Sequence, residues 1–113
     1  METGIAVAAV EAYFAAINAR DAAGIRALFE PDGELVTPAG RVSGAAAIAD
    51  FYSTQAFGAT DLRAVPGPLM ISGNRVSVEI RLRMHGLESR VADFFEIDSG
   101  RISRLSVYLG GPV

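Results

Sequence analysis

The spacing of the apolar residues changes near Gly58, and this change constrains the fold more than any other feature of the sequence. Before Gly58, apolar residues recur at the three- and four-residue spacing of amphipathic helices. After Gly58 they alternate with polar residues, most clearly from Val76 to Met84, as in a strand with one apolar and one charged face. Helices followed by strands indicate an α+β fold, with three helices packed on a curved, mostly antiparallel sheet.

Helix-capping and turn-forming residues set the expected bounds of these elements. Asp21 is a good N-cap for a short second helix that carries Phe29, and the turn-forming residues 31–33 would end it. We expect helices at about 4–19, 22–29 and 45–54, a hairpin tip at about 38–40, and strands near 60–71, 76–84, 87–98 and 101–109.

Composition excludes several classes of function. The chain has 113 residues, of which 50% are hydrophobic, so we expect one domain covering residues 1–113. The net charge is -3, and the ten cationic residues, all arginine, are scattered, which argues against nucleic acid as a partner. Without cysteine and with a single histidine, we expect no metal and no cofactor. No apolar stretch is long enough for a membrane span, and no secretory signal is evident, so a cytoplasmic location is expected.

Asp93 is the most unusual residue of the predicted sheet. Alternation places its side chain on the same face as Val91, Phe95 and Ile97. An ionised carboxylate is costly to bury there, so Asp93 should either find a partner or take up a proton. The alternative is an edge strand on which Asp93 is partly hydrated.

A curled sheet covered by helices would leave a pocket lined by the inward-facing residues. The alternative is that the same residues pack together as a closed core. The residues predicted to line the pocket are Tyr13, Phe14, Phe51, Tyr52, Val76, Val78, Ile80, Leu82, Met84, Asp93, Leu105, Val107 and Leu109. This set is almost wholly apolar, as pockets for small organic ligands usually are.

Four segments resemble the bacterial ketosteroid isomerases of the NTF2-like (SnoaL-like) superfamily. They are Val10–Asp21, Leu28–Gly33, Gly44–Tyr52 and Ala92–Ile102, and with the gaps between them they cover nearly the whole chain. The resemblance implies a cystatin-like, cone-shaped barrel with a pocket open at one end. It also implies a homodimer formed through the outer face of the sheet.

The resemblance assigns roles to several residues. In those isomerases a tyrosine and a protonated aspartic acid donate hydrogen bonds to the oxygen of a dienolate, and they correspond to Tyr13 and Asp93. Tyr52 corresponds to a supporting tyrosine, and Phe29 stands where some members have a third one. The early-strand aspartate that moves the proton corresponds to Thr37, which cannot be a general base near neutral pH.

Three functions therefore compete. The first is an isomerase or cyclase that polarises an oxygen of a steroid, terpenoid or polyketide-like ligand through Tyr13 and Asp93, with Thr37 at the usual base position. The second is a limonene-type epoxide hydrolase, although Val107 replaces its late aspartate and Arg75 and Ser77 replace its Arg and Asp pair. The third is a non-catalytic ligand-binding protein.

The predicted substrate-binding residues are Phe14, Phe29, Phe51, Tyr52, Val78, Ile80, Leu82, Phe95, Leu105 and Val107. Histidine is a common general base, but alternation places His85 on the charged face beside Arg83, so we expect a solvated or interface histidine there.

Overall fold

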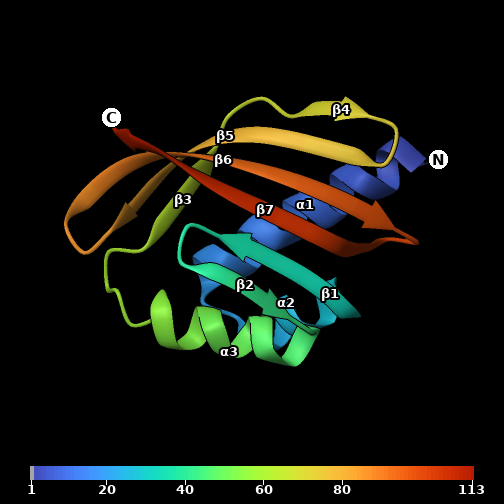
Figure 1. Ribbon diagram of the computed structural model, residues 1–113. Helices are drawn as coiled ribbons and strands as arrows, with labels where there is room; N and C mark the ends of the chain where they lie inside the picture. The colour runs from blue at the N-terminus through green and yellow to red at the C-terminus, as the bar shows by residue number, and fades with distance from the viewer. Residues whose placement is uncertain (1) are drawn as a thin grey trace.

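The computed structural model describes residues 2–113, which form three helices and a seven-stranded sheet (Figure 1). The helices are α1 (Glu2–Ala19), α2 (Ala22–Leu28) and α3 (Ala45–Gln55). The strands are β1 (Phe29–Thr37), β2 (Gly40–Ser43), β3 (Arg63–Pro66), β4 (Met70–Ser72), β5 (Arg75–Met84), β6 (Leu87–Asp98) and β7 (Arg101–Pro112). The predicted α+β class is therefore confirmed.

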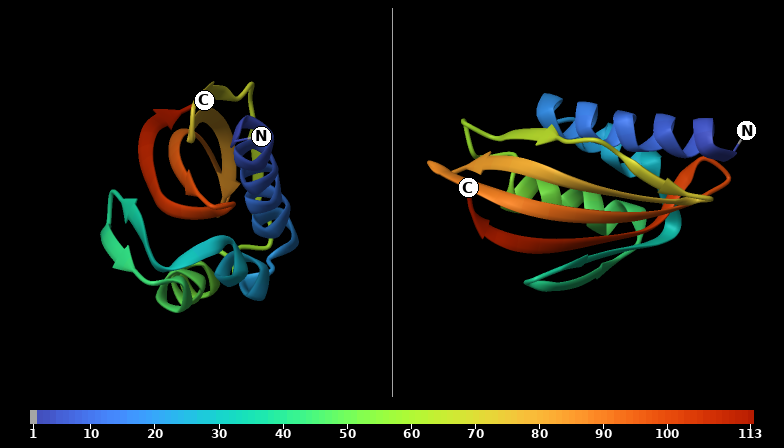
Figure 2. Two further views of the ribbon diagram at one scale, coloured as in Figure 1. Left: turned by 90° about the vertical axis from the view of Figure 1, so that its right-hand side faces the viewer. Right: turned by 90° about the horizontal axis from the view of Figure 1, so that it is seen from above.

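The strands follow the order β2-β1-β7-β6-β5-β3, and β4 pairs separately with β5. All pairs are antiparallel except β1 and β7, which are parallel. Figure 2 shows the sheet curling, with α1 lying along its concave side and α2 and α3 beside the β1–β2 hairpin. This arrangement is the cone in which a cavity can form.

The sequence signals for the helices operate as expected. The apolar stripe of α1 is buried, including Val10, Tyr13, Phe14 and Ile17. The carboxylate of Asp21 accepts a hydrogen bond of 2.9 Å from the backbone N–H of Gly24 and so caps α2.

The predicted end of the second helix is wrong, because Phe29 begins β1 instead of lying on the helix, and the predicted turn residues 31–33 lie inside that strand. The pairing of β1 with β7 is irregular between Phe29 and Glu34, which lets the strand continue through this stretch. A Cβ at Gly33 would lie 3.1 Å from the carbonyl oxygens of both Glu30 and Ile102, so glycine permits a close approach of backbones rather than a turn.

The single strand predicted near 60–71 is two strands, β3 and β4, separated by residues 67–69. Gly67 donates its N–H to the carbonyl of Glu79, and Pro68, which follows it, has no N–H to offer the sheet. The edge of β5 is consequently covered by two short strands.

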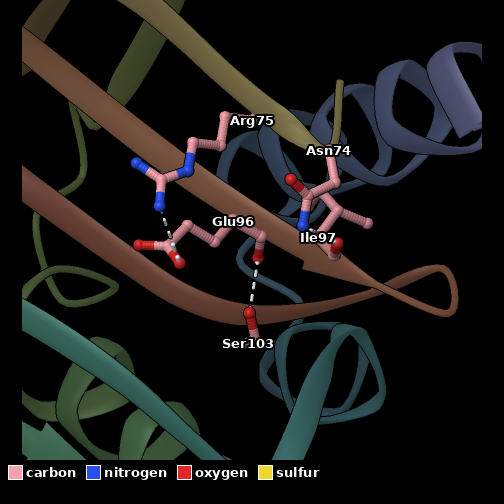
Figure 3. A network of polar contacts seen from close by, with 5 residues as sticks. All are labelled: Asn74, Arg75, Glu96, Ile97 and Ser103. Carbon is pink, nitrogen blue, oxygen red and sulfur yellow. Dashed lines mark hydrogen bonds and ion pairs between the residues drawn. The ribbon is translucent and has the colours of Figure 1, made fainter. Parts of the chain in front are cut away.

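A second irregularity lies between β6 and β7, where the register shifts between Glu96 and Ile97. Figure 3 shows how polar side chains hold this end of the sheet. The Ser103 hydroxyl donates to the Glu96 carbonyl over 3.1 Å, and the Asn74 side-chain amide donates to the Ile97 carbonyl over 3.1 Å. Arg75 lies 4.0 Å from the Glu96 carboxylate on the solvent-facing side.

Candidate functional site

The concave side of the sheet contains a cavity of about 340 Å³, enclosed by α1, α3, the hairpin tip between β1 and β2, and strands β3 and β5–β7. Its lining residues are Tyr13, Phe14, Ile17, Thr37, Pro38, Ala39, Phe51, Tyr52, Gln55, Ala56, Leu62, Ala64, Ile80, Leu82, Met84, Val91, Asp93 and Val107. A volume of this size suits a small organic molecule.

Asp93 lies in the wall of this cavity with only 3% of its surface exposed. Among residues 2–113, its buried Oδ1 atom has no hydrogen-bond partner. Burial disfavours the charged carboxylate and raises the pKa of Asp93 from 3.8 to about 7. The carboxyl group is therefore available near neutral pH both as a proton donor and as a proton acceptor.

Tyr13 and Tyr52 meet in the same cavity, with their hydroxyl oxygens 2.5 Å apart in a hydrogen bond. Burial is the largest cause that raises the pKa of each phenol, and the charge of Asp93 also raises the pKa of both. Both phenols are thus protonated near neutral pH. Their mutual bond uses one of the two hydroxyl hydrogens, which leaves the other free to donate to a ligand.

The Tyr13 ring is held in place by aromatic neighbours. It lies edge-on to Phe14 at 5.1 Å and to Phe95 at 5.2 Å between ring centroids. Edge-to-face contacts of this kind fix ring orientation and add to the stability gained by burial. The donor hydroxyl therefore sits on a rigid support.

Thr37 lines the cavity where β1 ends, but its side chain is already engaged by the hairpin tip. Its hydroxyl donates to the Gly40 carbonyl and accepts from the Ala39 N–H, both over 3.1 Å. With its only hydrogen committed to the turn, Thr37 stabilises the hairpin.

Most of the predicted ligand-contacting residues reach the cavity. Phe14, Phe51, Tyr52, Ile80, Leu82, Met84 and Val107 line it, as do Tyr13, Asp93 and Thr37. Five others do not: Phe29, Val76, Val78, Phe95 and Leu105 are buried in the closed core outside the cavity wall. For these residues the alternative of simple core packing is correct, because side chains fill that part of the cone.

Leu109 also differs from its prediction. It pairs with Val91 in the sheet register, yet 62% of its surface is exposed and it does not line the cavity. The strand β7 continues past Val107, beyond the cavity wall, so alternation alone does not bury Leu109.

The sequence did not identify eight of the lining residues, which are Ile17, Pro38, Ala39, Gln55, Ala56, Leu62, Ala64 and Val91. Ile17 and Val91 had a signal, because they share faces with Tyr13 and Asp93. The others lie on a hairpin tip, at or beyond the end of α3, or on the short strand β3, where periodicity carries no information about facing.

Neither a metal site nor a membrane span is found in the described part of the chain. Within residues 2–113, no group of three or more His, Cys, Asp or Glu side chains could hold a metal ion. None of the helices described is long and apolar enough to cross a membrane.

Comparison with known families identifies the family of this chain. A model of the SnoaL-like domain matches residues 10–105. The chain belongs to the SnoaL-like domain family. No curated protein matches this SnoaL-like domain in sequence.

Several solved structures resemble this SnoaL-like domain in fold. A protein proposed to be a ketosteroid isomerase from Kribbella flavida is 20% identical, with a TM-score of 0.85, covering 97% of this chain and 81% of its own. A protein proposed to be a polyketide cyclase from Sinorhizobium meliloti is 25% identical, with a TM-score of 0.80, covering 88% and 93%. An LEH-like epoxide hydrolase from M. tuberculosis is 24% identical, with a TM-score of 0.78, covering 94% and 83%. The fold is thus the NTF2-like α+β cone.

Proposed function

We propose that this SnoaL-like domain binds a small, largely apolar ligand and polarises one of its oxygen atoms through Tyr13 and Asp93. The observation that carries the proposal is the Asp93 carboxyl group, buried in an apolar cavity with one oxygen unpartnered among residues 2–113. A protein gains nothing in stability from such a group. A steroid, terpenoid or polyketide-like ligand with a carbonyl or enolate oxygen would supply the missing hydrogen-bond partner.

The chemistry of the oxygen follows from the donors. A protonated Asp93 donates one hydrogen bond, and the Tyr13–Tyr52 pair donates a second through its free hydroxyl hydrogen. Two fixed donors in a low-dielectric cavity stabilise the negative charge that develops on a carbonyl oxygen during enolisation. Tyr52 acts through Tyr13, because their hydrogen bond orients the donor hydroxyl.

The cavity offers few groups that could accept the proton removed from the substrate. Asp93 is the only carboxylic acid among the lining residues, and the Thr37 hydroxyl is held by the hairpin tip. Three acceptors fit the proposed enzyme: Asp93 in its ionised form, a water held at Thr37, or a basic group of the substrate. The reaction class is therefore isomerisation or cyclisation with an atypical base.

A non-catalytic ligand-binding protein is the second candidate. The hydrogen bonds of the Thr37 hydroxyl within the hairpin tip favour this candidate, because a cavity without a base can still hold an oxygen-bearing ligand. An epoxide hydrolase of the limonene type is disfavoured. The side chain at its late acid position is the apolar Val107, and Arg75 lies outside the cavity wall beside Glu96 (Figure 3).

The outer face of the sheet supports a further proposal, that two copies form a homodimer. Phe94 and Tyr108 are 49% and 59% exposed there and contact each other edge-on at 5.6 Å. Met70, 71% exposed, lies on the same face, and Ser77 lies between it and Phe94 in the sheet register. A contiguous exposed apolar surface of this kind is typical of a protein interface.

Charges beside this apolar surface are self-complementary. Glu34, Arg104, Glu96 and Arg75 lie opposite one another across β1, β7, β6 and β5, so the signs alternate along the row. A two-fold rotation reverses the row and places each glutamate opposite an arginine. This pattern favours a second copy of the same chain as the partner.

Restoring a base at position 37 tests the proposed catalytic site. We expect the parent to isomerise 5-androstene-3,17-dione slowly and Thr37→Asp to be about 100-fold faster or more, the range of a general base. An aspartate can keep the hydrogen bond from the Ala39 N–H, so the hairpin tip should survive the change. The measurement is the steady-state rate by absorbance of the conjugated product.

The control for this assay is Thr37→Asp combined with Tyr13→Phe, which keeps the new base and removes the proposed oxygen donor. We expect that double variant to lose most of the gain. A Thr37→Asp variant no faster than the parent would contradict the proposed enzyme site. A double variant as fast as Thr37→Asp would contradict the role of Tyr13.

A further inference from the structure

The connection from α3 to β3, residues 56–62, forms part of the cavity wall, and we name it the rim segment. Figure 1 shows it as the yellow-green connection between these two elements. Ala56 and Leu62 line the cavity, and the Phe57 ring stacks on Tyr52 with centroids 6.1 Å apart and planes inclined by 23°. The rim segment therefore supports the tyrosine that bonds to Tyr13.

Arg20 holds the rim segment from one side. Its Nη2 atom donates to the carbonyls of Ala59, Thr60 and Leu62 at 2.9, 3.1 and 3.3 Å. Among residues 3–113, no carboxylate forms an ion pair with Arg20. Its charge is instead stabilised by three carbonyl oxygens of one segment. Arg20 also adopts a φ of 56°, which turns the chain sharply at the end of α1.

Asp61 holds the rim segment from the other side. Its carboxylate accepts hydrogen bonds from the backbone N–H groups of His85 and Gly86 at 2.9 and 2.8 Å. These bonds, with Gly86 the larger cause, lower the pKa of Asp61, so the carboxylate stays ionised near neutral pH. The turn it holds follows Met84, which also lines the cavity.

These contacts link α1, α3 and the rim segment to one another. Helix α1 carries Tyr13, Tyr13 bonds to Tyr52, Tyr52 stacks on Phe57, and Arg20 returns the rim segment to the end of α1. No strand pairing is found within residues 56–62. The side chains of Ala59 and Leu62 are buried, and the contacts of Arg20 and Asp61 join the rim segment to the end of α1 and to the turn after β5.

We propose that Arg20 is a positioning residue of the ligand site, which holds the rim segment closed and thereby keeps Tyr52 in place against Tyr13. This inference rests on the proposed function only for the identity of the ligand. Arg20 itself touches no ligand and does not line the cavity. It acts on ligand binding through the backbone of the rim segment.

The ligand experiment uses 2-naphthol, a fluorescent phenol, mixed with the protein in a stopped-flow instrument at pH 6. We expect Arg20→Gln to raise the dissociation rate constant about fivefold or more and to change the association rate constant less, since losses of this kind fall mostly on dissociation. Arg20→Lys should retain part of the effect, because it keeps the charge and loses the fork of donors.

A second measurement needs no ligand. With tyrosine labelled at the ring Cζ carbon, we expect Arg20→Gln to shift the NMR signals of Tyr13 and Tyr52 and to leave that of the exposed Tyr108 unchanged. Amide hydrogen exchange at Ala59 and Leu62, whose N–H groups bond within the rim segment, should accelerate at least tenfold.

Two matched variants separate positioning from general effects. Arg26→Gln removes an equal charge from α2, and Ile97→Val loosens the core at the far end of β6. Neither should change the naphthol dissociation rate or the Tyr52 signal. Unchanged dissociation, exchange and tyrosine signals in Arg20→Gln would overturn the inference.

A failure of the proposed function would look different. The parent and Asp93→Asn would then bind 2-naphthol equally well, whether or not Arg20 is also replaced. If Arg20→Gln does not fold, the dissociation rate of 2-naphthol, the amide exchange rates and the tyrosine signals of Arg20→Lys test the inference instead.

Discussion

Burial of the Asp93 carboxyl raises its pKa from 3.8 to about 7, and this shift has a consequence for stability. Between these two pH values the folded protein keeps a proton that the unfolded chain releases. The free energy of unfolding must therefore fall as the pH rises through this window. At about 1.4 kcal/mol per pKa unit, the free energy of unfolding falls by at most about 4 kcal/mol across this window, and the fall is complete above about pH 7.

We predict that Asp93→Asn removes this pH dependence. Relative to the parent, the variant should gain about 1–4 kcal/mol in the free energy of unfolding between pH 4 and pH 8. Urea denaturation at both pH values measures this gain, and Asp98→Asn, an exposed acid, is the control. An equal effect of Asp93→Asn at both pH values would contradict a pKa of Asp93 that is raised by folding.

Local spacing predicted that the two central side chains of the candidate site point inward. Alternation in β6 placed Asp93 inward and the helical spacing in α1 placed Tyr13 inward, whereas the resemblance to ketosteroid isomerases, not the spacing, paired them. The state of Thr37 could not be predicted in the same way. Its hydroxyl is committed to Gly40 and Ala39, and that commitment depends on the geometry of the hairpin tip.

At the scale of elements, periodic sequence predicted well. The bounds of β6 match the prediction, and α1 and α3 differ from it by at most two residues. Patterns of this kind are reliable because burial of one face dominates the energetics of a long amphipathic element.

The irregular elements escaped prediction for a common reason. The bulged start of β1, the extra residue at Ser103 in β7 and the split between β3 and β4 all depend on which backbone lies alongside. The parallel pairing of β1 with β7 is likewise a contact between distant parts of the chain. No local spacing encodes such neighbours.

The rim segment contacts the site but was not predicted from the sequence. The predicted strand began near residue 60, whereas β3 begins at Arg63, and Arg20 resembles any surface arginine in the sequence. Only the fold brings Arg20 to the carbonyls of Ala59, Thr60 and Leu62.

At the scale of the whole molecule, the curl of the sheet separates a concave face from a convex face. The concave face holds the cavity, and the convex face presents Phe94 and Tyr108 to solvent. A ligand site and a dimer interface can therefore coexist, as the alternation of strand side chains requires.

We predict that the parent is a dimer of twice the 11.9 kDa chain mass and that Phe94→Glu is a monomer. A carboxylate in the centre of the apolar surface would have to be buried unpaired in the interface, which is costly. Light scattering after size-exclusion chromatography measures the mass. Leu87→Glu, at an exposed apolar position outside this surface, should stay dimeric. A monomeric parent, or a dimeric Phe94→Glu, would argue against this interface.

The affinity for 2-naphthol across pH 5–9 tests most directly whether Tyr13 and Asp93 hold the ligand oxygen. At pH 6 we expect Tyr13→Phe and Asp93→Asn each to weaken binding by more than tenfold, since each removes or weakens a donor in an apolar cavity. The parent should bind progressively more weakly above about pH 7, as Asp93 ionises, and Asp93→Asn should lack this dependence. Binding by both variants that equals the parent at pH 6 would contradict the proposed site.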